Sequence, residues 1–158
     1  ACPTLTLGRY AYDHGDTAKL TPLLKMFTLG SSFVPPGIHA GGLRYHGMAP
    51  LVSHVLDLGL IETAAVPQLE VFESGVRFAR AEGIVPAPEA SHAVAIALRE
   101  AQRCKEQGKA ETILFNLSGH GHFDMQSYTD YFAGKLRNYA YPEHEIAMAL
   151  AGLPSIVD

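Results

Sequence analysis

The segment LFNLSGHGHFD at Leu114–Asp124 decides the fold class of this chain. Its apolar first residues predict a short buried strand, and the Ser-Gly-His-Gly-His turn that follows predicts where the strand ends. Such a turn frees backbone N–H groups and a serine hydroxyl at the carboxyl end of a strand, where open α/β sheets bind their ligands. The segment therefore predicts an α/β sheet with a ligand site beside this strand.

Three interpretations of the turn remain open from the residues alone. His120, His122 and Asp124 have the residue types of a metal site, but they converge on one ion only if the segment is extended. The neighbouring glycines leave that conformation open. The two histidines can instead cap a loop and face solvent. In the third interpretation, Ser118 and Gly119 form a turn that binds a cofactor.

Composition limits the class of protein further. With 158 residues, 47% of them hydrophobic, the chain is long enough for one domain with a buried core and too short for two ordinary ones. The 12 Lys and Arg against 16 Asp and Glu give a formal net charge of −4 without a basic run, which argues against nucleic acid or an acidic membrane as a partner. No apolar stretch is long enough to span a bilayer, and the first residues lack a signal-peptide pattern. We therefore expect one domain over residues 1–158, located in the cytoplasm.

Helices are expected to alternate with strands along the chain. The first predicted helix starts at Asp16 or Thr17, either of which can accept bonds from free backbone N–H groups, and ends at Gly30. A loop rich in glycine and proline follows at Ser31–Pro50 and is expected to pack down as a functional loop. Further helices are predicted at Pro50–Leu60, Gln68–Arg80, Ser91–Gly108, Gln126–Leu136 and Glu143–Leu150, and strands at Thr63–Val66 and Thr112–Leu117. Strands separated by helices imply parallel pairing in a layered α/β fold.

Three segments carry a resemblance to a known family: GLRYHGMAP at Gly42–Pro50, EGIVPAPEASHA at Glu82–Ala93 and LFNLSGHGHFD at Leu114–Asp124. In order and spacing they resemble the carboxyl-terminal domain of the tryptophan synthase beta chain, and more closely its divergent second branch. The resemblance covers nearly the whole chain. It implies a fold-type II pyridoxal-phosphate enzyme, whose carboxyl-terminal part is a three-layer α/β domain with a parallel sheet flanked by helices.

The resemblance also implies a set of cofactor-binding residues. Ser118 falls on the family's serine that hydrogen-bonds the pyridine nitrogen of the cofactor, and Gly119 completes that turn. A hydroxyl at this place leaves the nitrogen largely unprotonated, which favours β-elimination over competing reactions. Glu89 falls on the family's glutamate near the pyridine ring, and Gly42 falls where the backbone approaches the cofactor. The alternative for Glu89 is a solvated carboxylate before a helix.

The substrate side departs from the family's usual pattern. Arg44 replaces an aspartate and His46 replaces a proline in the turn after Gly42, and His120 replaces an arginine after the serine turn. A guanidinium favours an anionic group, so Arg44 is a candidate for selecting O-phosphoserine over L-serine. Alternatively, Arg44 takes part in gating of the site, or it is a surface arginine in a loop without a functional role.

Two parts that the family's chemistry needs are missing from the sequence. These are the Schiff-base lysine and the glycine-rich loop that holds the cofactor phosphate. None of the five lysines lies in a supporting motif. We therefore expect this chain to be the second half of such a subunit, with no catalytic residue of its own and inactive without the amino-terminal half.

The leading hypothesis is thus part of a cytoplasmic lyase that joins L-serine or O-phosphoserine to indole to give L-tryptophan. The resemblance implies pyridoxal phosphate, a monovalent cation bound partly by backbone carbonyls around Tyr45, a homodimer, and an alpha-type subunit as a further option. The alternatives are a non-catalytic α/β fragment that binds a partner and another β-eliminating pyridoxal-phosphate enzyme such as a serine dehydratase. A metal-dependent hydrolase would use His39, His46, His120, His122 and Asp124.

Overall fold

The computed structural model describes residues 3–155 and divides them into two compact units. The helical unit consists of Ile38–Leu43 and Val66–Tyr139. The hairpin unit consists of residues 3–37, Arg44–Ala65 and residues 140–155. The expectation of one domain over residues 1–158 stays a prediction.

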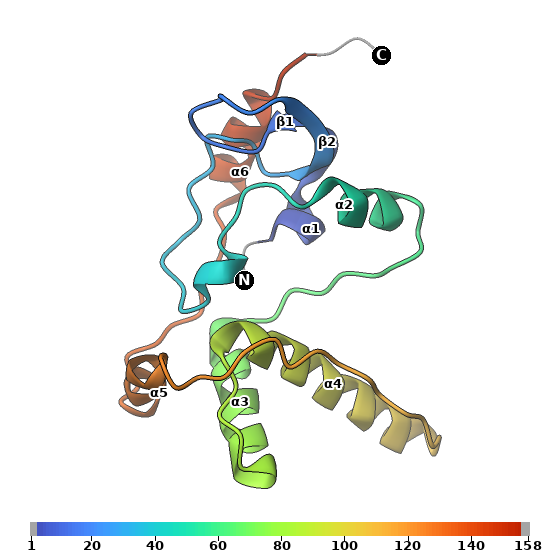
Figure 1. Ribbon diagram of the computed structural model, residues 1–158, viewed down its shortest axis with the longest axis vertical. Helices are drawn as coiled ribbons and strands as arrows, with labels where there is room; N and C mark the ends of the chain where they lie inside the picture. Colours follow the sequence, from blue (N-terminus) through green and yellow to red (C-terminus); the bar gives the residue numbers. More distant parts are fainter. Residues whose placement is uncertain (1–2, 156–158) are drawn as a thin grey trace. The chain divides into compact units, whose positions relative to one another are not determined.

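The hairpin unit contains the only sheet in residues 3–155, a two-stranded one (Figure 1). Strands β1 (Arg9–His14) and β2 (Leu23–Thr28) pair antiparallel, with Arg9 opposite Thr28 and His14 opposite Leu23. Three helices complete the unit: α1 (Thr4–Leu7), α2 (Pro50–Asp57) and α6 (Glu143–Ala151). Both α1 and α2 contact β2.

A small apolar cluster and one buried polar pair stabilise the hairpin unit. Leu29 and Phe33, which follow β2, pack against Ile146 of α6, and all three side chains are buried. The hydroxyl of Thr28 donates to the Asp13 carboxylate over 2.6 Å, and both residues are fully buried. Because buried polar groups need partners, this pair fixes the two strands at one register.

The helix predicted from Asp16 or Thr17 to Gly30 is wrong, because the segment forms a turn and β2. Pro22 lies in its middle, where a proline removes a helical hydrogen bond and clashes with the preceding turn. Asp16 does accept backbone N–H groups, but they belong to Leu20 and Thr21 of the turn between β1 and β2. The residue expected to start a helix therefore closes a hairpin connection.

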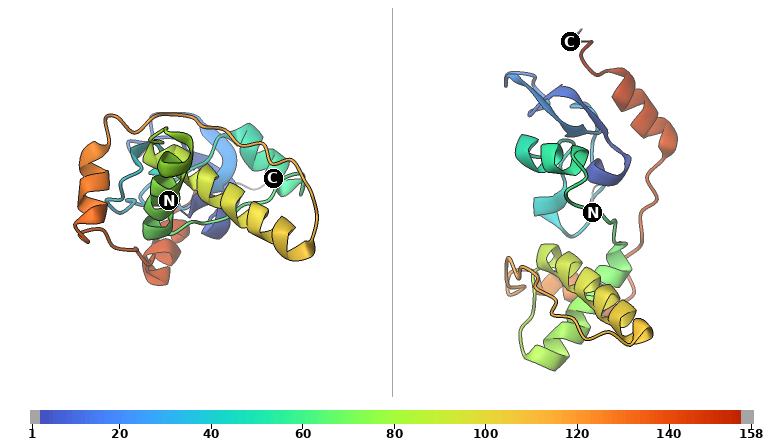
Figure 2. Two further views of the ribbon diagram at one scale, coloured as in Figure 1. Left: turned by 90° about the horizontal axis from the view of Figure 1, so that it is seen from below. Right: turned by 90° about the vertical axis from the view of Figure 1, so that its right-hand side faces the viewer.

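The helical unit is built on three helices and a short 3-10 turn. They are α3 (Gln68–Glu82), α4 (Pro88–Gln107), α5 (Met125–Phe132) and η1 (Gly41–Leu43). In Figures 1 and 2, α3 and α4 lie side by side at their amino-terminal ends and diverge toward their carboxyl-terminal ends. Where they meet, Val71 of α3 and Ala95 of α4 are buried together with Val66.

The helix ends follow the sequence signals closely. Gly83 and Gly108 end α3 and α4 in the left-handed conformation, with φ of 71° and 64°, as their positions in the sequence predict. The predicted helices around α2, α3, α5 and α6 are confirmed, whereas α4 begins at Pro88 rather than at Ser91. Proline suits the first turn of a helix, so Ser91 lies inside α4 and its hydroxyl donates to the Ala87 carbonyl. No helix in the described part of the chain is long and apolar enough to cross a membrane.

The chain is thus a mixed α/β structure, but the predicted strands at Thr63–Val66 and Thr112–Leu117 are not formed in residues 3–155. A strand needs a neighbouring strand for its backbone N–H and C=O groups. The second segment has no such neighbour here, and Leu114 is 95% exposed. The apolar pattern that predicted a buried strand therefore has no strand or core to join within the described residues.

Candidate functional site

The serine turn lies against the start of α4. The Gly119 carbonyl accepts a hydrogen bond from the Ala87 N–H over 2.9 Å, and the Gly121 N–H donates to the Val85 carbonyl over 2.7 Å. A Cβ atom at Gly121 would lie 2.6 Å from the Pro86 carbonyl oxygen, so this close approach requires glycine. Two of the three motif segments are therefore joined through their backbones.

The segment Gly42–Pro50, here called the glycine motif, contacts the start of α4 through Glu89. The Gly42 N–H donates to the Glu89 Oε1 over 2.9 Å, and a Cβ atom at Gly42 would lie 3.4 Å from that carboxylate. Glu89 is in the first turn of α4, where the helix dipole stabilises a negative charge. The helical unit thus brings Gly42, Glu89 and the serine turn together at the start of α4.

Ser118 is available to a ligand. Its side chain is exposed, and its hydroxyl has no hydrogen-bond partner among residues 3–155. A hydroxyl can both donate and accept one hydrogen bond, so it suits a ring nitrogen in either protonation state. The role that the resemblance assigns to Ser118 is thus open to it chemically.

The histidines of the turn contact each other rather than forming a metal site. The His120 and His122 rings are 4.5 Å apart between centroids, and the His122 N–H donates to the His120 Nδ1 over 3.3 Å. Both residues are exposed. Within the described residues, the structure places no three His, Cys, Asp or Glu side chains where they could share an ion. Residues 3–155 therefore give the metal-dependent hydrolase hypothesis no support, and it stays a prediction.

The other two substrate-side candidates lie in the hairpin unit. Arg44 is exposed, and its Nη2 donates to the Pro35 carbonyl over 3.0 Å. His46 is buried, and its Nε2 donates to the His14 carbonyl over 2.8 Å. The guanidinium of Arg44 retains N–H groups for a ligand, whereas the His46 ring serves the hairpin.

A buried junction that sequence analysis missed supports the turn from below. The Tyr128 hydroxyl donates to the Pro86 carbonyl over 2.6 Å and lies 3.4 Å from the Ser91 hydroxyl oxygen. Burial raises the pKa of Tyr128, with the Ser91 hydrogen bond opposing that shift. A Cβ atom at Gly75 of α3 would lie 2.7 Å from both hydroxyl oxygens. The sequence signal for this close contact is Gly75 itself, because glycine is disfavoured in the middle of a helix unless a neighbour needs the space.

Two further polar side chains hold the segment that carries Gly42. The Gln68 Oε1 accepts the His39 N–H over 2.9 Å, while its Nε2 donates to the Arg137 carbonyl over 2.9 Å. His39 Nδ1 also lies 3.0 Å from the Ser127 hydroxyl oxygen. Gln68 and Ser127 are buried, so these bonds anchor Ile38–Leu43 on α3 and α5.

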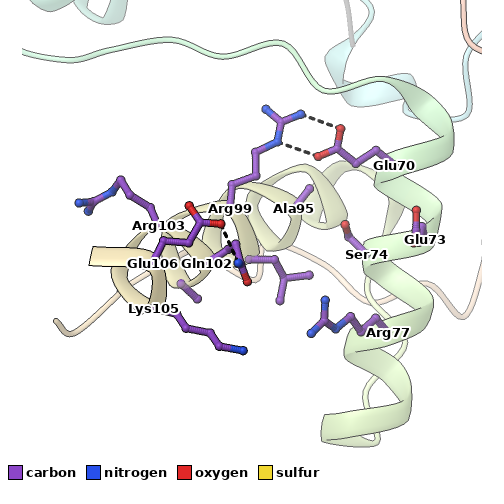
Figure 3. Close-up of a pocket in the computed structure, with 12 residues that line it drawn as sticks. Glu70, Glu73, Ser74, Arg77, Ala95, Arg99, Gln102, Arg103, Lys105 and Glu106 are labelled. Atoms are coloured by element: carbon purple, nitrogen blue, oxygen red, sulfur yellow. Dashed lines mark hydrogen bonds and ion pairs between the residues drawn. The ribbon is translucent and has the colours of Figure 1, made fainter. Parts of the chain in front are cut away.

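A groove of the helical unit lies elsewhere, between the diverging parts of α3 and α4 (Figure 3). It has a volume of about 580 Å³ and is lined mostly by charged side chains. Figure 3 shows the Arg99 guanidinium paired through two nitrogens with the Glu70 carboxylate, at 2.7 and 2.6 Å. None of the residues from the three motifs that were assigned to cofactor or substrate lines this groove. We therefore place the candidate site at the start of α4, because the motif residues meet there, and not in the groove.

Comparison with known proteins finds relatives that match most of this chain. The chain is 62% identical to tryptophan synthase beta chain 2 of Methanosarcina acetivorans over 136 residues, which are 86% of this chain and 31% of that relative. It is homologous to the tryptophan synthase beta chains. The identity is 61% with tryptophan synthase beta chain 2 of Aquifex aeolicus over the same shares of both chains. With the tryptophan synthase beta chain of Pyrococcus horikoshii it is 52% over 149 residues, or 94% of this chain and 32% of the relative.

These matches confirm the resemblance that the three motif segments indicated, including the second branch of the family. The chain spans about a third of the length of the curated relatives it matches. No family model matches the chain.

Proposed function

We propose that this chain is a carboxyl-terminal segment of a pyridoxal-phosphate-dependent tryptophan synthase beta subunit, which joins L-serine or O-phosphoserine to indole to give L-tryptophan. The observation that carries the proposal is the meeting of the three motif segments at the start of α4. The identity of 52–62% to tryptophan synthase beta chains supports it independently of that geometry.

The residues at this place fit the cofactor. Ser118 offers an exposed hydroxyl to the pyridine nitrogen, Glu89 offers a carboxylate near the ring, and the Gly42 backbone leaves room for close approach. The bound cofactor supplies the electron sink that makes loss of a β-substituent possible. Ser118 sets the strength of that sink, because a hydroxyl does not hold a proton on the nitrogen as a carboxylate would.

The rest of the subunit supplies what this chain lacks. We assign to it the lysine that binds the cofactor covalently and the loop that holds its phosphate, so this chain alone is inactive and holds no catalytic residue. We also assign to it the strands that pair with Thr112–Leu117 in a parallel sheet, because the exposed Leu114 and Leu117 of that segment need partners. A homodimer, an alpha-type subunit and a monovalent cation near Tyr45 belong to the same proposal, as does the cytoplasmic location.

A substitution of Ser118 in the full-length subunit tests the function. Ser118→Ala removes the hydroxyl and is expected to lower the rate of tryptophan formation from L-serine and indole by roughly tenfold, as loss of one such hydrogen bond predicts. Ser118→Asp is expected to change the absorption spectrum of the bound cofactor, because a carboxylate stabilises the protonated form of the ring nitrogen. Ser32→Ala, an exposed serine in the hairpin unit, is the matched control. Unchanged rates and spectra in both Ser118 variants would contradict the proposal.

The choice between serine and O-phosphoserine rests on Arg44. We propose that its exposed guanidinium binds an anionic substituent. Arg44→Asp in the full-length subunit is expected to shift the preference from O-phosphoserine to L-serine, measured as the ratio of kcat/KM values. Arg9→Asp, at another exposed arginine of the hairpin unit, is the control. An unchanged ratio in Arg44→Asp excludes this role.

The other functions that share the site make different predictions. A serine dehydratase would release a keto acid and ammonia at the same rate with and without indole, whereas a synthase would convert indole stoichiometrically. A non-catalytic partner-binding fragment would be isolated with the 17.0 kDa mass of this chain. A synthase subunit would have a mass about three times as large, given the share of its relatives that this chain spans.

A further inference from the structure

A small internal cavity lies in the helical unit, between the segment before η1 and the first turns of α3 and α4. Its volume is about 10 Å³. Val71, Phe72 and Ala40 provide apolar walls, while His39, Gln68 and His92 bring polar groups to it. A cavity needs roughly 10–15 Å³ to hold one water molecule, so this one has room for a single water and nothing larger.

One nitrogen of the His92 ring is hydrogen-bonded, and the other has no hydrogen-bond partner among residues 3–155. Its Nδ1 lies 2.8 Å from the Pro88 carbonyl oxygen, and a carbonyl can only accept, so Nδ1 carries the proton. Burial lowers the pKa of His92 from its usual value of 6.5, against the opposing effect of the Pro88 hydrogen bond. Burial thus favours the neutral ring, in which Nδ1 carries the proton and Nε2 is a lone-pair acceptor.

That acceptor is the unusual group of the helical unit. His92 Nε2 is buried, and it is the one buried side-chain nitrogen or oxygen in residues 3–155 without a hydrogen-bond partner. Buried polar groups in folded proteins are satisfied by protein atoms or by internal water. His92 also lines a cavity of one water's size.

We propose that one internal water molecule binds in this cavity and donates a hydrogen bond to His92 Nε2. Gln68 is the expected second partner. Its amide uses one lone pair for the His39 N–H and one N–H for the Arg137 carbonyl, so one lone pair and one N–H remain. A buried water normally makes two to four hydrogen bonds, and these groups supply enough of them.

The water would complete the support of the segment that carries Gly42. It links α4 at His92 to the Gln68 side chain, which holds the backbone of His39. Three residues further on, Gly42 donates to Glu89, one turn before His92 on α4. The water site does not depend on the proposed function, because it requires no cofactor and no substrate.

A high-resolution crystal structure of the full-length protein tests the proposal. The expected result is a density peak for one water within hydrogen-bonding distance of both His92 Nε2 and the Gln68 side chain. The absence of a peak would overturn the proposal, and so would a donor to Nε2 from another part of the protein.

Substitution gives a second test. His92→Phe keeps a ring of similar size but removes both nitrogens, so we expect the water peak to disappear and the melting temperature to fall by several degrees. His144→Phe, an exposed histidine of α6, is the control that leaves both unchanged. If His92→Phe does not fold, the nitrogen-15 shift of Nε2 in the unsubstituted protein decides. A hydrogen-bonded unprotonated nitrogen supports the water site, and a free one overturns it.

Discussion

The backbone N–H of Gly42 donates to the carboxylate of Glu89 over 2.9 Å, across 47 positions of the chain. This bond joins the glycine motif to the first turn of α4, and the Ala87 N–H joins the serine turn to the residue just before that helix. Three motifs that are far apart in the sequence therefore meet at one helix start. Such a place favours anionic groups, because free N–H groups and the helix dipole are both directed toward it.

Glu89→Ala is expected to loosen the glycine motif. The variant removes the acceptor of the Gly42 N–H, which costs about 1 kcal/mol of local stability for a hydrogen bond near the surface. Hydrogen exchange of the Gly42 amide should become faster by up to roughly tenfold. Glu143→Ala, in the first turn of α6, is the matched control because it contributes a similar charge to a helix dipole. An equal change of Gly42 exchange in both variants would show that Glu89 does not hold this amide.

Gly75→Ala is expected to destabilise the helical unit by about 1–3 kcal/mol. The added methyl group would meet the Ser91 and Tyr128 hydroxyl oxygens at 2.7 Å, and neither side chain has free space to move, since both are buried. Gly37→Ala, where an added Cβ atom meets nothing within 4 Å, is the control. Urea unfolding midpoints measure the difference, and a stability gain in Gly75→Ala would contradict the packing described at this junction.

Tyr128→Phe isolates the hydrogen bond to Pro86 from the packing of the ring. The variant leaves the Pro86 carbonyl without its 2.6 Å donor, so we expect a loss of about 1–2 kcal/mol. Tyr139→Phe, at a tyrosine that is 49% exposed, should change stability little. The comparison is made by thermal unfolding. Equal melting temperatures for the two variants would mean that the Tyr128 hydroxyl does not stabilise the turn.

Asp16 gives the hairpin unit a dependence on acid pH. Hydrogen bonds from the Thr21 backbone and side chain and from the Leu20 backbone lower the pKa of Asp16 from 3.8 to about 2. Because the folded state binds this proton less readily than the unfolded state, its stabilising effect is present above pH 3.8 and is lost as the pH falls toward 2. Asp16→Asn should remove that part of the pH dependence of unfolding.

Asp57→Asn changes an exposed aspartate at the end of α2 and is the control. This variant should retain the acid-pH dependence of unfolding that Asp16 causes. A carboxyl titration by NMR reports the same group directly. An Asp16 midpoint near 3.8 would contradict the bonding described for the turn.

The sequence predicted the helices of the helical unit more accurately than the hairpin. Gly83 and Gly108 predicted the ends of α3 and α4 because only glycine adopts their left-handed conformation without cost. The sequence did not predict the hairpin because Leu23, Leu24 and Phe27 also fit a helical face, although Pro22 is incompatible with the middle of a helix. Local patterns decide a helix end, whereas the choice between helix and hairpin depends on tertiary partners.

The candidate site was only partly predictable for a similar reason. Resemblance indicated Gly42, Glu89 and Ser118, and the structure brings their segments together. It could not indicate Tyr128 or Gln68, because their roles arise from contacts between distant segments that no local pattern encodes. The strand expected at Thr112–Leu117 depends on neighbours that residues 3–155 do not supply.

We propose that the start of α4 and the serine turn hold the ring of pyridoxal phosphate. The most direct measurement is a crystal structure of the full-length subunit with this cofactor bound, in which the position of the pyridine nitrogen is read against Ser118. We expect the Ser118 hydroxyl to lie within hydrogen-bonding distance of that nitrogen, with Glu89 and Gly42 beside the ring. A ring nitrogen bound by any other side chain, or a cofactor away from the start of α4, would contradict it.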